Sequence, residues 1–320
     1  MLSFNAKVTI GPYDASASFS EFEGTSTWKS IGDSATLKLG GLRARLENQI
    51  TTGMKVTVEL GYDGQYFPEF EGYVAEIMPT LPFTLRLEDA AYQLKRQTVT
   101  KSWKSVSLKD VLRYLYDGPV SISVPDVTLA PFRLDRVSKY KALEKIKEEF
   151  GLTIYFRGAT LFAGLAYTDK QAKDVVLYRI TGDWRQQLAP NVVDSDLTYK
   201  RRDDVRLGVR AVSILRNNKR VEAKVGDEDG DQITMHFYNV TSEASLKKLA
   251  TEKLNLLKFE GYRGSLTTFG IPGVEHGMAA QLRDELYPER EMEVFVDEVK
   301  TSVSKSNGFR RVLQLGRKAS

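Results

Sequence analysis

The sequence predicts a mainly β protein with α+β insertions, built from two barrel-like β domains around an α+β middle module. Apolar and polar residues alternate with a period of two in the first hundred residues, helical apolar spacing dominates from about residue 102, and the alternation returns from about Asp196. At 320 residues the chain is too long for one ordinary core, because single cores stop growing near about 250 residues. We therefore expect domains at 1–101, 102–178 and 179–320.

The first domain is predicted to be a hairpin-rich sheet, folded as a small barrel or sandwich. Three stretches alternate as half-buried antiparallel strands do, at 37–39, 56–60 and 83–87. Gly61-Tyr62-Asp63-Gly64 contains residues that tolerate positive φ, so it is expected to turn the chain toward a further strand at 70–77.

The middle module begins with a helix, because Ser107 precedes Asp110 with the spacing of an N-cap box. Leu108, Val111, Leu112 and Leu115 form its apolar stripe, and Gly118-Pro119 ends it. The other elements expected here are a strand at 120–124, a helix at 140–150 that ends at Gly151, and a hairpin over 152–166 that turns at Arg157-Gly158.

The last domain combines strands with a helix-containing insertion, which we place at about 241–290. Its helix is predicted over 242–259, with one apolar face. The members of that face are Leu246, Leu249, Ala250, Leu254 and Leu257. The predicted strands cover 205–209, 221–225, 233–237, 292–299 and 310–315, and Ser306-Asn307-Gly308 is the turn between the last two. No internal repeat is visible in the sequence.

Composition excludes several kinds of chemistry. The chain has no cysteine and therefore no disulfide, thiolate nucleophile or zinc–thiolate site, which fits synthesis in a reducing cytoplasm. Neither a signal peptide nor a stretch long enough to span a membrane is visible. The net charge of +4 is small for this length, so no sequence-specific nucleic-acid binding is expected.

The two histidines, His236 and His276, have no second ligand nearby in the sequence, and we interpret them as surface or loop residues rather than as metal ligands or general bases. Asp227, Asp229 and Asp231 suggest a calcium loop. The glycine at the fourth position and a tyrosine at the twelfth break the EF-hand spacing. A solvated hairpin tip is the preferred interpretation, and no metal or cofactor is expected.

No catalytic residue is predicted. The adjacent carboxylates Glu88-Asp89, Glu148-Glu149 and Asp203-Asp204 would point to opposite faces of a strand, and surface solvation is expected for them. Nucleophile-elbow, Walker and zinc-protease motifs are absent from the sequence. A tail-associated peptidoglycan hydrolase remains an alternative function that these carboxylates leave open.

Two surface features have weak functional signals. The basic run Lys200-Arg201-Arg202 is followed at once by two aspartates, which cancel most of its field and favour a structural role over phosphate binding. Tyr62, Tyr66 and Phe67 could contact a partner but more often such residues cover a local core. A carbohydrate-binding receptor-recognition module is therefore a second alternative function.

Two stretches resemble the late control D, or baseplate hub, family of phage tails, which is related to the N-terminal part of type VI secretion spike proteins. The first runs from Val56 to about residue 103 and includes Phe70–Ile77 and Leu87–Lys95. The second runs over residues 249–316 and includes Gly264–Gly273, Val294–Val299 and Val312–Gly316. The structural positions of the family pattern are Gly61, Gly72, Gly264, Gly270, Pro272 and Gly316.

The resemblance implies a structural, non-enzymatic hub in the baseplate of a virion or prophage tail, made in the bacterial cytoplasm. It implies a homotrimer with two tube-type barrels per chain, which adapts a hexameric tail tube to a trimeric spike and lets the tape-measure protein pass. Because the chain ends soon after Gly316, the resemblance implies that the spike is a separate protein. The chain departs from the family in the loop 273–290, where a helical turn is predicted at 279–286, and at Glu291, where many relatives have glycine.

Overall fold

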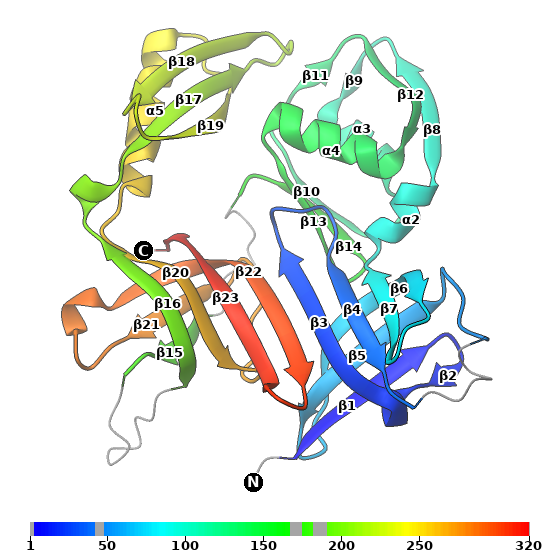
Figure 1. Cartoon of the computed structure of the whole chain (residues 1–320). Helices are drawn as coiled ribbons and strands as arrows, with labels where there is room; N and C mark the ends of the chain where they lie inside the picture. The colour runs from blue at the N-terminus through cyan, green and yellow to red at the C-terminus, as the bar shows by residue number, and fades with distance from the viewer. Residues whose placement is uncertain (1–2, 42–47, 167–174, 182–190, 320) are drawn as a thin grey trace.

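The computed structural model describes residues 3–41, 48–166, 175–181 and 191–319. It is mainly β, as predicted, and the α-helices of the described residues lie within 91–150 and at 243–257. Its largest sheet contains 13 strands, and the order along its main path is β16-β20-β23-β22-β3-β4-β7-β6-β5-β1-β2. Figure 1 shows β16 to β7 side by side as one layer, with two further lobes above it.

The first β unit consists of strands β1 to β7. Their bounds are β1 Phe4–Ile10, β2 Tyr13–Asp14, β3 Phe19–Thr27, β4 Ser34–Leu39, β5 Lys55–Tyr62, β6 Phe67–Met78 and β7 Phe83–Glu88. Val56, Val58 and Leu60 alternate inward from β5 as the sequence pattern predicts, and each is fully buried. Asp63 and Gly64 adopt positive φ at the β5–β6 turn, so that turn is confirmed.

The middle domain extends from α2 to β14. It contains α2 Ala91–Arg96, β8 Thr98–Trp103, β9 Val106–Ser107, α3 Leu108–Leu115, β10 Val120–Ser123, β11 Thr128–Leu129, β12 Phe132–Ser138, α4 Lys139–Phe150, β13 Thr153–Arg157 and β14 Thr160–Gly164. Ser107 caps α3 by accepting from the Asp110 amide, and Gly151 ends α4 in the left-handed conformation, both as predicted. Helix α3 ends earlier than expected, because Tyr116 is already extended.

The second β unit and a small lobe make up the rest. The second β unit contains β15 Val175–Arg179, β16 Val192–Lys200, β20 Gly261–Phe269, β21 Ala279–Arg283, β22 Met292–Ser304 and β23 Gly308–Lys318. The small lobe, inserted between β16 and β20, contains β17 Leu207–Ile214, β18 Arg220–Gly226, β19 Asp231–Tyr238 and α5 Glu243–Leu257. The 3-10 turns are Ser16–Ser18, Arg202–Asp204 and Pro288–Arg290.

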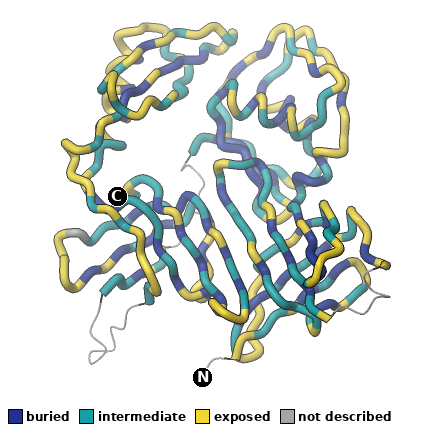
Figure 2. The backbone as a smooth tube through the Cα atoms, viewed as in Figure 1, coloured by how far each residue is buried: buried dark blue, intermediate teal, exposed yellow. Residues whose placement is uncertain are grey.

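Each part has its own apolar core, and Figure 2 shows buried and partly exposed residues alternating along the sheet strands. The two β units nevertheless form one continuous sheet, because β3 pairs antiparallel with the C-terminal half of β22. Val303 and Phe309 of the second β unit pack into the core of the first. The junction between the β units is therefore both hydrogen-bonded and apolar.

Several expectations were wrong. Residues 279–283 form strand β21 rather than a helical turn, because pairing with β22 overrides the helical preference of Ala279-Ala280-Gln281-Leu282. The strands expected at 205–237 exist, but they form a separate three-stranded sheet, in which β18 and β19 flank β17. The Asp227–Asp231 segment is consequently a crossover connection rather than a hairpin tip.

Candidate assembly surface

The two β units repeat one strand order, which the sequence pattern did not predict. The order β3-β4-β7-β6 in the first β unit matches β16-β20-β23-β22 in the second, and all neighbouring strands are antiparallel in both. Irregularities recur at matching points: the register shifts after Phe19 in β3 and after Val192 in β16. It also shifts between Val74 and Glu76 and between Val296 and Glu298.

The turn that leads into the outer strand of each unit is repeated as well. Gly53-Met54 precedes β5 and Gly277-Met278 precedes β21, and the two glycines have φ of 88° and 87°. The Gly53 amide donates to the Val74 carbonyl and the Gly277 amide to the Val296 carbonyl, each at 2.7 Å. Matching hydrogen bonds at bulges of matching register indicate that the two units are structural repeats.

A short sequence signal accompanies the repeat. Glu71-Gly-Tyr-Val-Ala-Glu-Ile77 in β6 aligns through the bulges with Glu293-Val-Phe-Val-Asp-Glu-Val299 in β22. Comparison of these two segments could have shown the repeat from the sequence. The interval of 222 residues and the large insertions between them hid it.

One face of the shared layer is polar from edge to edge. Directly opposed residues share a face of a sheet, and two rows of such residues cross seven strands. The first row is Phe269, Arg310, Ser302, Glu23, Thr36, Arg86 and Glu76, and the second is Asp194, Thr267, Val312, Lys300, Thr25, Ser34 and Glu88. The face therefore carries charges of both signs and little apolar surface.

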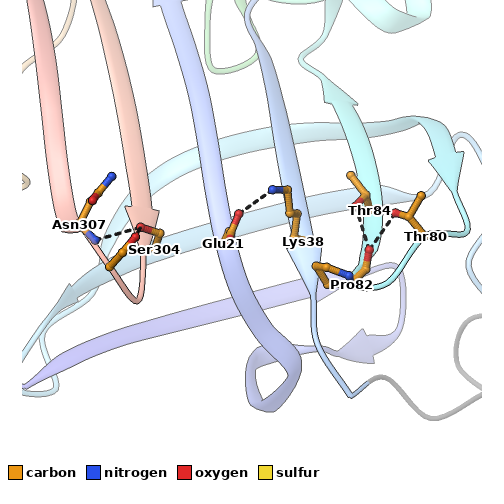
Figure 3. Close-up of polar contacts among 8 residues, drawn as sticks. Glu21, Lys38, Thr80, Pro82, Thr84, Ser304 and Asn307 are labelled. Atoms are coloured by element: carbon orange, nitrogen blue, oxygen red, sulfur yellow. Dashed lines mark hydrogen bonds and ion pairs between the residues drawn. The ribbon is translucent and has the colours of Figure 1, made fainter.

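The two ends of the layer differ in their connections. At one end, which we name the short-turn rim, the hairpins β6–β7 and β22–β23 close through residues 79–82 and 305–307. Figure 3 shows this rim: Thr80 and Thr84 donate to the Pro82 carbonyl, and the Asn307 amide donates to Ser304. Lys38 and Glu21 form an ion pair of 2.6 Å beside these turns.

The opposite end, which we name the insertion rim, carries both large insertions. The middle domain follows β7 and the small lobe follows β16 at this end, where the first β unit has only the loop 28–33 after β3. The two β units thus share a short hairpin at the short-turn rim, and their insertions make them different at the insertion rim.

Two edges of the layer pair with no strand among the described residues. One is the outer edge of β16, which pairs only with β20; six of its nine residues are exposed, and the other three are partly exposed. The other is the edge of residues 75–78 in β6 that faces away from β7, since the pairing of β6 with the β5 side stops at Val74. Unpaired edges of this kind are templates for pairing with another chain.

The loop 28–33 contacts both the second β unit and the middle domain: the Trp28 indole donates to Asp297 of β22, and the Phe156 amide of β13 donates to the Ile31 carbonyl, each at 3.1 Å. The Asp33 carboxylate accepts from the Thr27 amide at 3.2 Å, and Asp89 accepts from the Asp33 amide at 2.9 Å. Burial, together with the neighbouring Asp89 carboxylate, raises the pKa of Asp33 to about 7. Burial also raises the pKa of Asp89 to about 6. The expectation of a solvated Glu88-Asp89 pair was therefore wrong for Asp89.

The histidines lie in separate surroundings. His276 is in a loop, as predicted, but it is buried: its Nδ1 is 2.9 Å from the Ser26 hydroxyl and its ring is 4.7 Å from that of Tyr155. The surface interpretation of His276 was wrong. His236 is half-buried on β19 against Gly151 at the end of α4. The structure does not bring the two histidines into one contact that could hold a metal.

Two of the remaining carboxylate candidates, Asp227 and Glu149, have structural partners. Asp227 forms an ion pair with Lys258 and accepts from the Leu207 amide at 3.0 Å. Glu149 pairs with Arg220 at 3.1 Å. In the described part of the chain, no group of three or more His, Cys, Asp or Glu side chains has the proximity needed to hold a metal ion.

Four of the six family-pattern positions lie where backbone or a ring approaches closely. A Cβ on Gly61 would meet the Gln65 carbonyl, one on Gly72 the Glu88 carbonyl, and one on Gly264 the Asp196 carbonyl. A Cβ on Gly270 would meet the Phe309 ring. Pro272 lies in the loop after β20 and Gly316 in β23. Tyr66 and Phe67 are each 46% exposed beside the β5–β6 turn.

No helix among the described residues is long and apolar enough to cross a membrane. No family model matches the sequence, and no curated protein matches it. The fold is nevertheless shared with known tail proteins.

A tail protein of Neisseria meningitidis superposes with a TM-score of 0.64 at 16% identity, over 99% of this chain and 97% of that one. A 43 kDa prophage tail protein from Shewanella oneidensis gives 0.61 at 14% identity, over 98% and 97%. An E. coli protein described as a component of the type VI secretion system, with structural similarity to phage T4 tail proteins, gives 0.59 at 7% identity, over 98% and 77%. The chain therefore has, over nearly its whole length, the fold of phage and prophage tail proteins.

Proposed function

We propose that this protein is the structural hub of a phage or prophage tail, in which three copies form a ring with six β units. The observation that carries the proposal is the repeat of strand order, bulges and turns within one chain. Two equivalent units per chain allow three chains to present six equivalent docking surfaces, which a hexameric tail tube requires. The division into barrel-like units near 1–101 and 179–320 with a middle domain near 102–178 belongs to the same proposal.

The repeat also predicts how neighbouring copies pair. Within the chain, β3 pairs with the end of β22, so that Thr27 opposes Glu298 and Ser26 opposes Val299. The repeat-equivalent strands are β16 and β6, whose edges lack a partner strand among the described residues. If β16 of one copy pairs with β6 of the next in the same register, Lys200 lies opposite Glu76 and Tyr199 lies opposite Ile77. The opposed Lys–Glu pair supplies charge complementarity at this junction.

The difference between the two rims supports a role in symmetry adaptation. The short-turn rim shows similar hairpins from both β units, so in a ring of three chains it would present six similar positions to a tail tube. The insertion rim carries one middle domain and one small lobe per chain, so it would present three positions to a trimeric spike. The polar face would line the passage for the tape-measure protein, because it offers few apolar contacts.

The proposal places the protein in the tail baseplate, with itself, a tail tube protein, a spike protein and a tape-measure protein as partners. The fold shared with tail proteins supports this location, and the absence of a predicted catalytic residue fits a structural role.

Cysteine cross-linking tests the ring, because the native chain contains no cysteine. The variant Glu76→Cys/Lys200→Cys places thiols on two exposed positions that the transferred register opposes. Oxidation should link each chain to two others and give a covalent closed trimer. The matched control Glu71→Cys/Lys200→Cys uses an exposed residue on the part of β6 that already pairs with β5, and it should stay uncrosslinked.

A protein that remains monomeric, alone and with its tube and spike partners, by light scattering at all concentrations would overturn the hub assignment. Trimers that form without cross-linking at Glu76 and Lys200 would reject the pairing register and keep the hub.

A further inference from the structure

The small lobe is built as a separate body. Its core contains Val209, Ala211, Ala223, Leu246, Ala250 and Leu254, all from β17, β18 and α5, and this cluster is distinct from those of the β units and the middle domain. Only two single segments join the lobe to the second β unit, residues 201–206 on the way in and 258–260 on the way out. Figure 1 shows both segments at the base of the lobe.

The base of the lobe is hollow, and its lining mixes charged with apolar side chains. A cleft of about 570 Å³ separates the lobe from the second β unit, and both connecting segments line it. Its charged lining includes Lys200, Asp204, Arg206, Asp231, Arg263 and Arg317. Because this charged surface is accessible to water, few apolar contacts across the cleft stabilise one orientation of the lobe relative to the second β unit. The connection at the base is therefore suited to act as a hinge.

The far end of the lobe contacts the middle domain instead. Ile214 is fully buried and belongs to the core of the middle domain, with Tyr238 packed against the same cluster. The Tyr238 hydroxyl donates to the Phe150 carbonyl, and Arg220 pairs with Glu149 at 3.1 Å. The Thr128 amide donates to the Arg216 carbonyl at 2.9 Å.

These contacts converge on the C-terminal end of α4. Phe150 and Gly151 are its last residue and its left-handed cap, and Glu149 lies one position earlier. His236 packs so closely over Gly151 that a Cβ at position 151 would collide with the imidazole. Arg220 from β18 and both His236 and Tyr238 from β19 therefore contact the C-terminal end of α4.

We propose that the small lobe is a hinged strap, latched onto the end of α4 by Tyr238, Arg220 and His236 and able to swing on residues 201–206 and 258–260. With the latch closed, the lobe links the middle domain to the second β unit and so supports it. The chain reaches the second β unit only after it has completed the middle domain. Opening the latch frees the middle domain on that side and widens the insertion rim. The strap depends on contacts within one chain, so it does not rest on the proposed ring.

Spin-label distance measurements test the strap in the full-length chain, which has no native cysteine. Labels are attached at Lys109→Cys on α3 and Lys224→Cys on β18, both exposed. The labelled protein should show one distance population. Addition of Glu149→Gln/Tyr238→Phe removes the ion pair and the hydroxyl, and should create a second, longer population that holds at least one tenth of the molecules.

The matched control is Glu148→Gln/Tyr114→Phe, which makes the same chemical changes in the same domain at exposed positions whose side chains form no hydrogen bond or ion pair with the lobe. It should keep the single population. An unchanged distribution in the latch variant, with intact folding by circular dichroism, would overturn the strap.

A reversible lock gives a second measurement. In Glu149→Cys/Arg220→Cys the oxidised form holds the latch closed and the reduced form lacks the ion pair. Amide hydrogen exchange in β19 and at the end of α4 should be at least tenfold faster in the reduced form than in the oxidised form. Equal exchange in both forms would contradict a latch that opens.

Discussion

Arg311 and Glu69 form a bidentate ion pair that joins the second β unit to the first and is buried on both sides. Arg311 Nη1 and Nη2 lie 3.2 and 2.6 Å from the two Glu69 carboxylate oxygens, and each side chain is only 8% exposed. The remaining guanidinium donors reach the Gly270 carbonyl at 2.8 Å and the Thr301 hydroxyl at 3.1 Å. The ion pair therefore holds the two β units together, and both of its buried charges have hydrogen-bond partners.

Removal of one partner should destabilise the junction between the β units. We expect Glu69→Gln to lower the free energy of unfolding by about 3–5 kcal/mol, because the Arg311 charge stays buried without its counter-ion. Arg210–Glu222 offers a matched control, since it is also bidentate but about half exposed. Glu222→Gln should cost less than about 1 kcal/mol. Urea unfolding measures both, and equal losses would contradict the role of burial.

The buried carboxylates beneath the middle domain predict a stability that falls as pH rises. The pKa of Asp33 is raised to about 7 in the folded protein, so its stabilising contribution is complete below its unfolded pKa near 4 and is lost as pH rises through about 7. The charged groups facing it are Asp89 and Glu275, and both disfavour its ionisation.

The variant Asp33→Asn keeps an oxygen that can accept from the Thr27 amide and cannot ionise. Between pH 5 and pH 8 it should gain stability relative to the native chain, on the order of 1–2 kcal/mol. Urea unfolding at the two pH values gives this difference. A constant difference between variant and native chain at both pH values would reject a raised pKa at Asp33.

The repeat predicts equal responses at equivalent glycines. Gly53 and Gly277 share a left-handed φ near 88° and have no atom closer than 3.5 Å to an added Cβ. Gly53→Ala and Gly277→Ala should therefore each cost about 1–2 kcal/mol through backbone strain alone. Gly273→Ala is the control, because Gly273 has open space and no positive φ. Thermal unfolding checks the series, and clearly unequal costs at the two turns would argue against equivalent turns.

Local elements were predictable because their signals lie within a few residues. The alternation in β5, the Ser107 cap and the Gly151 stop each act over less than three helical turns, and the structure confirms them. Pairing between β3 and β22 depends on residues about 270 positions apart, and nothing in the local pattern encodes it. The strand at 279–283 was missed for the same reason, since its partner β22 decides its conformation.

The candidate surface was less predictable than the fold. Gly61, Gly72 and Gly264 lie at close backbone approaches. The unpaired edges of β16 and β6, the buried Asp33 and the His236 contact all arise from tertiary arrangement. His236 alternates on its strand like any outward residue, and only the docking of the lobe onto α4 places it in a half-buried contact.

That contact makes the latch sensitive to acid. Burial first, and then the nearby Arg220 and Arg210, lower the pKa of His236 below its ordinary value of 6.5. A histidine with a lowered folded pKa contributes stability above about pH 6.5 that is lost as pH falls below it. Glu149 and the carbonyl end of α4 also face this group, but Glu149 is already engaged by Arg220. Protonation therefore adds a positive charge beside Arg220 and Arg210, whose carboxylate partners Glu149 and Glu222 are already paired.

We expect the spin-labelled chain to show the longer distance population at pH 5.5 and not at pH 8. His236→Gln, which cannot gain a charge in this range, should keep the single population at both pH values. His276 takes no part in the contact between the lobe and α4, so substitution of His236 alone tests whether His236 causes the pH response. Identical distributions at both pH values in the native chain would show that His236 does not control the latch.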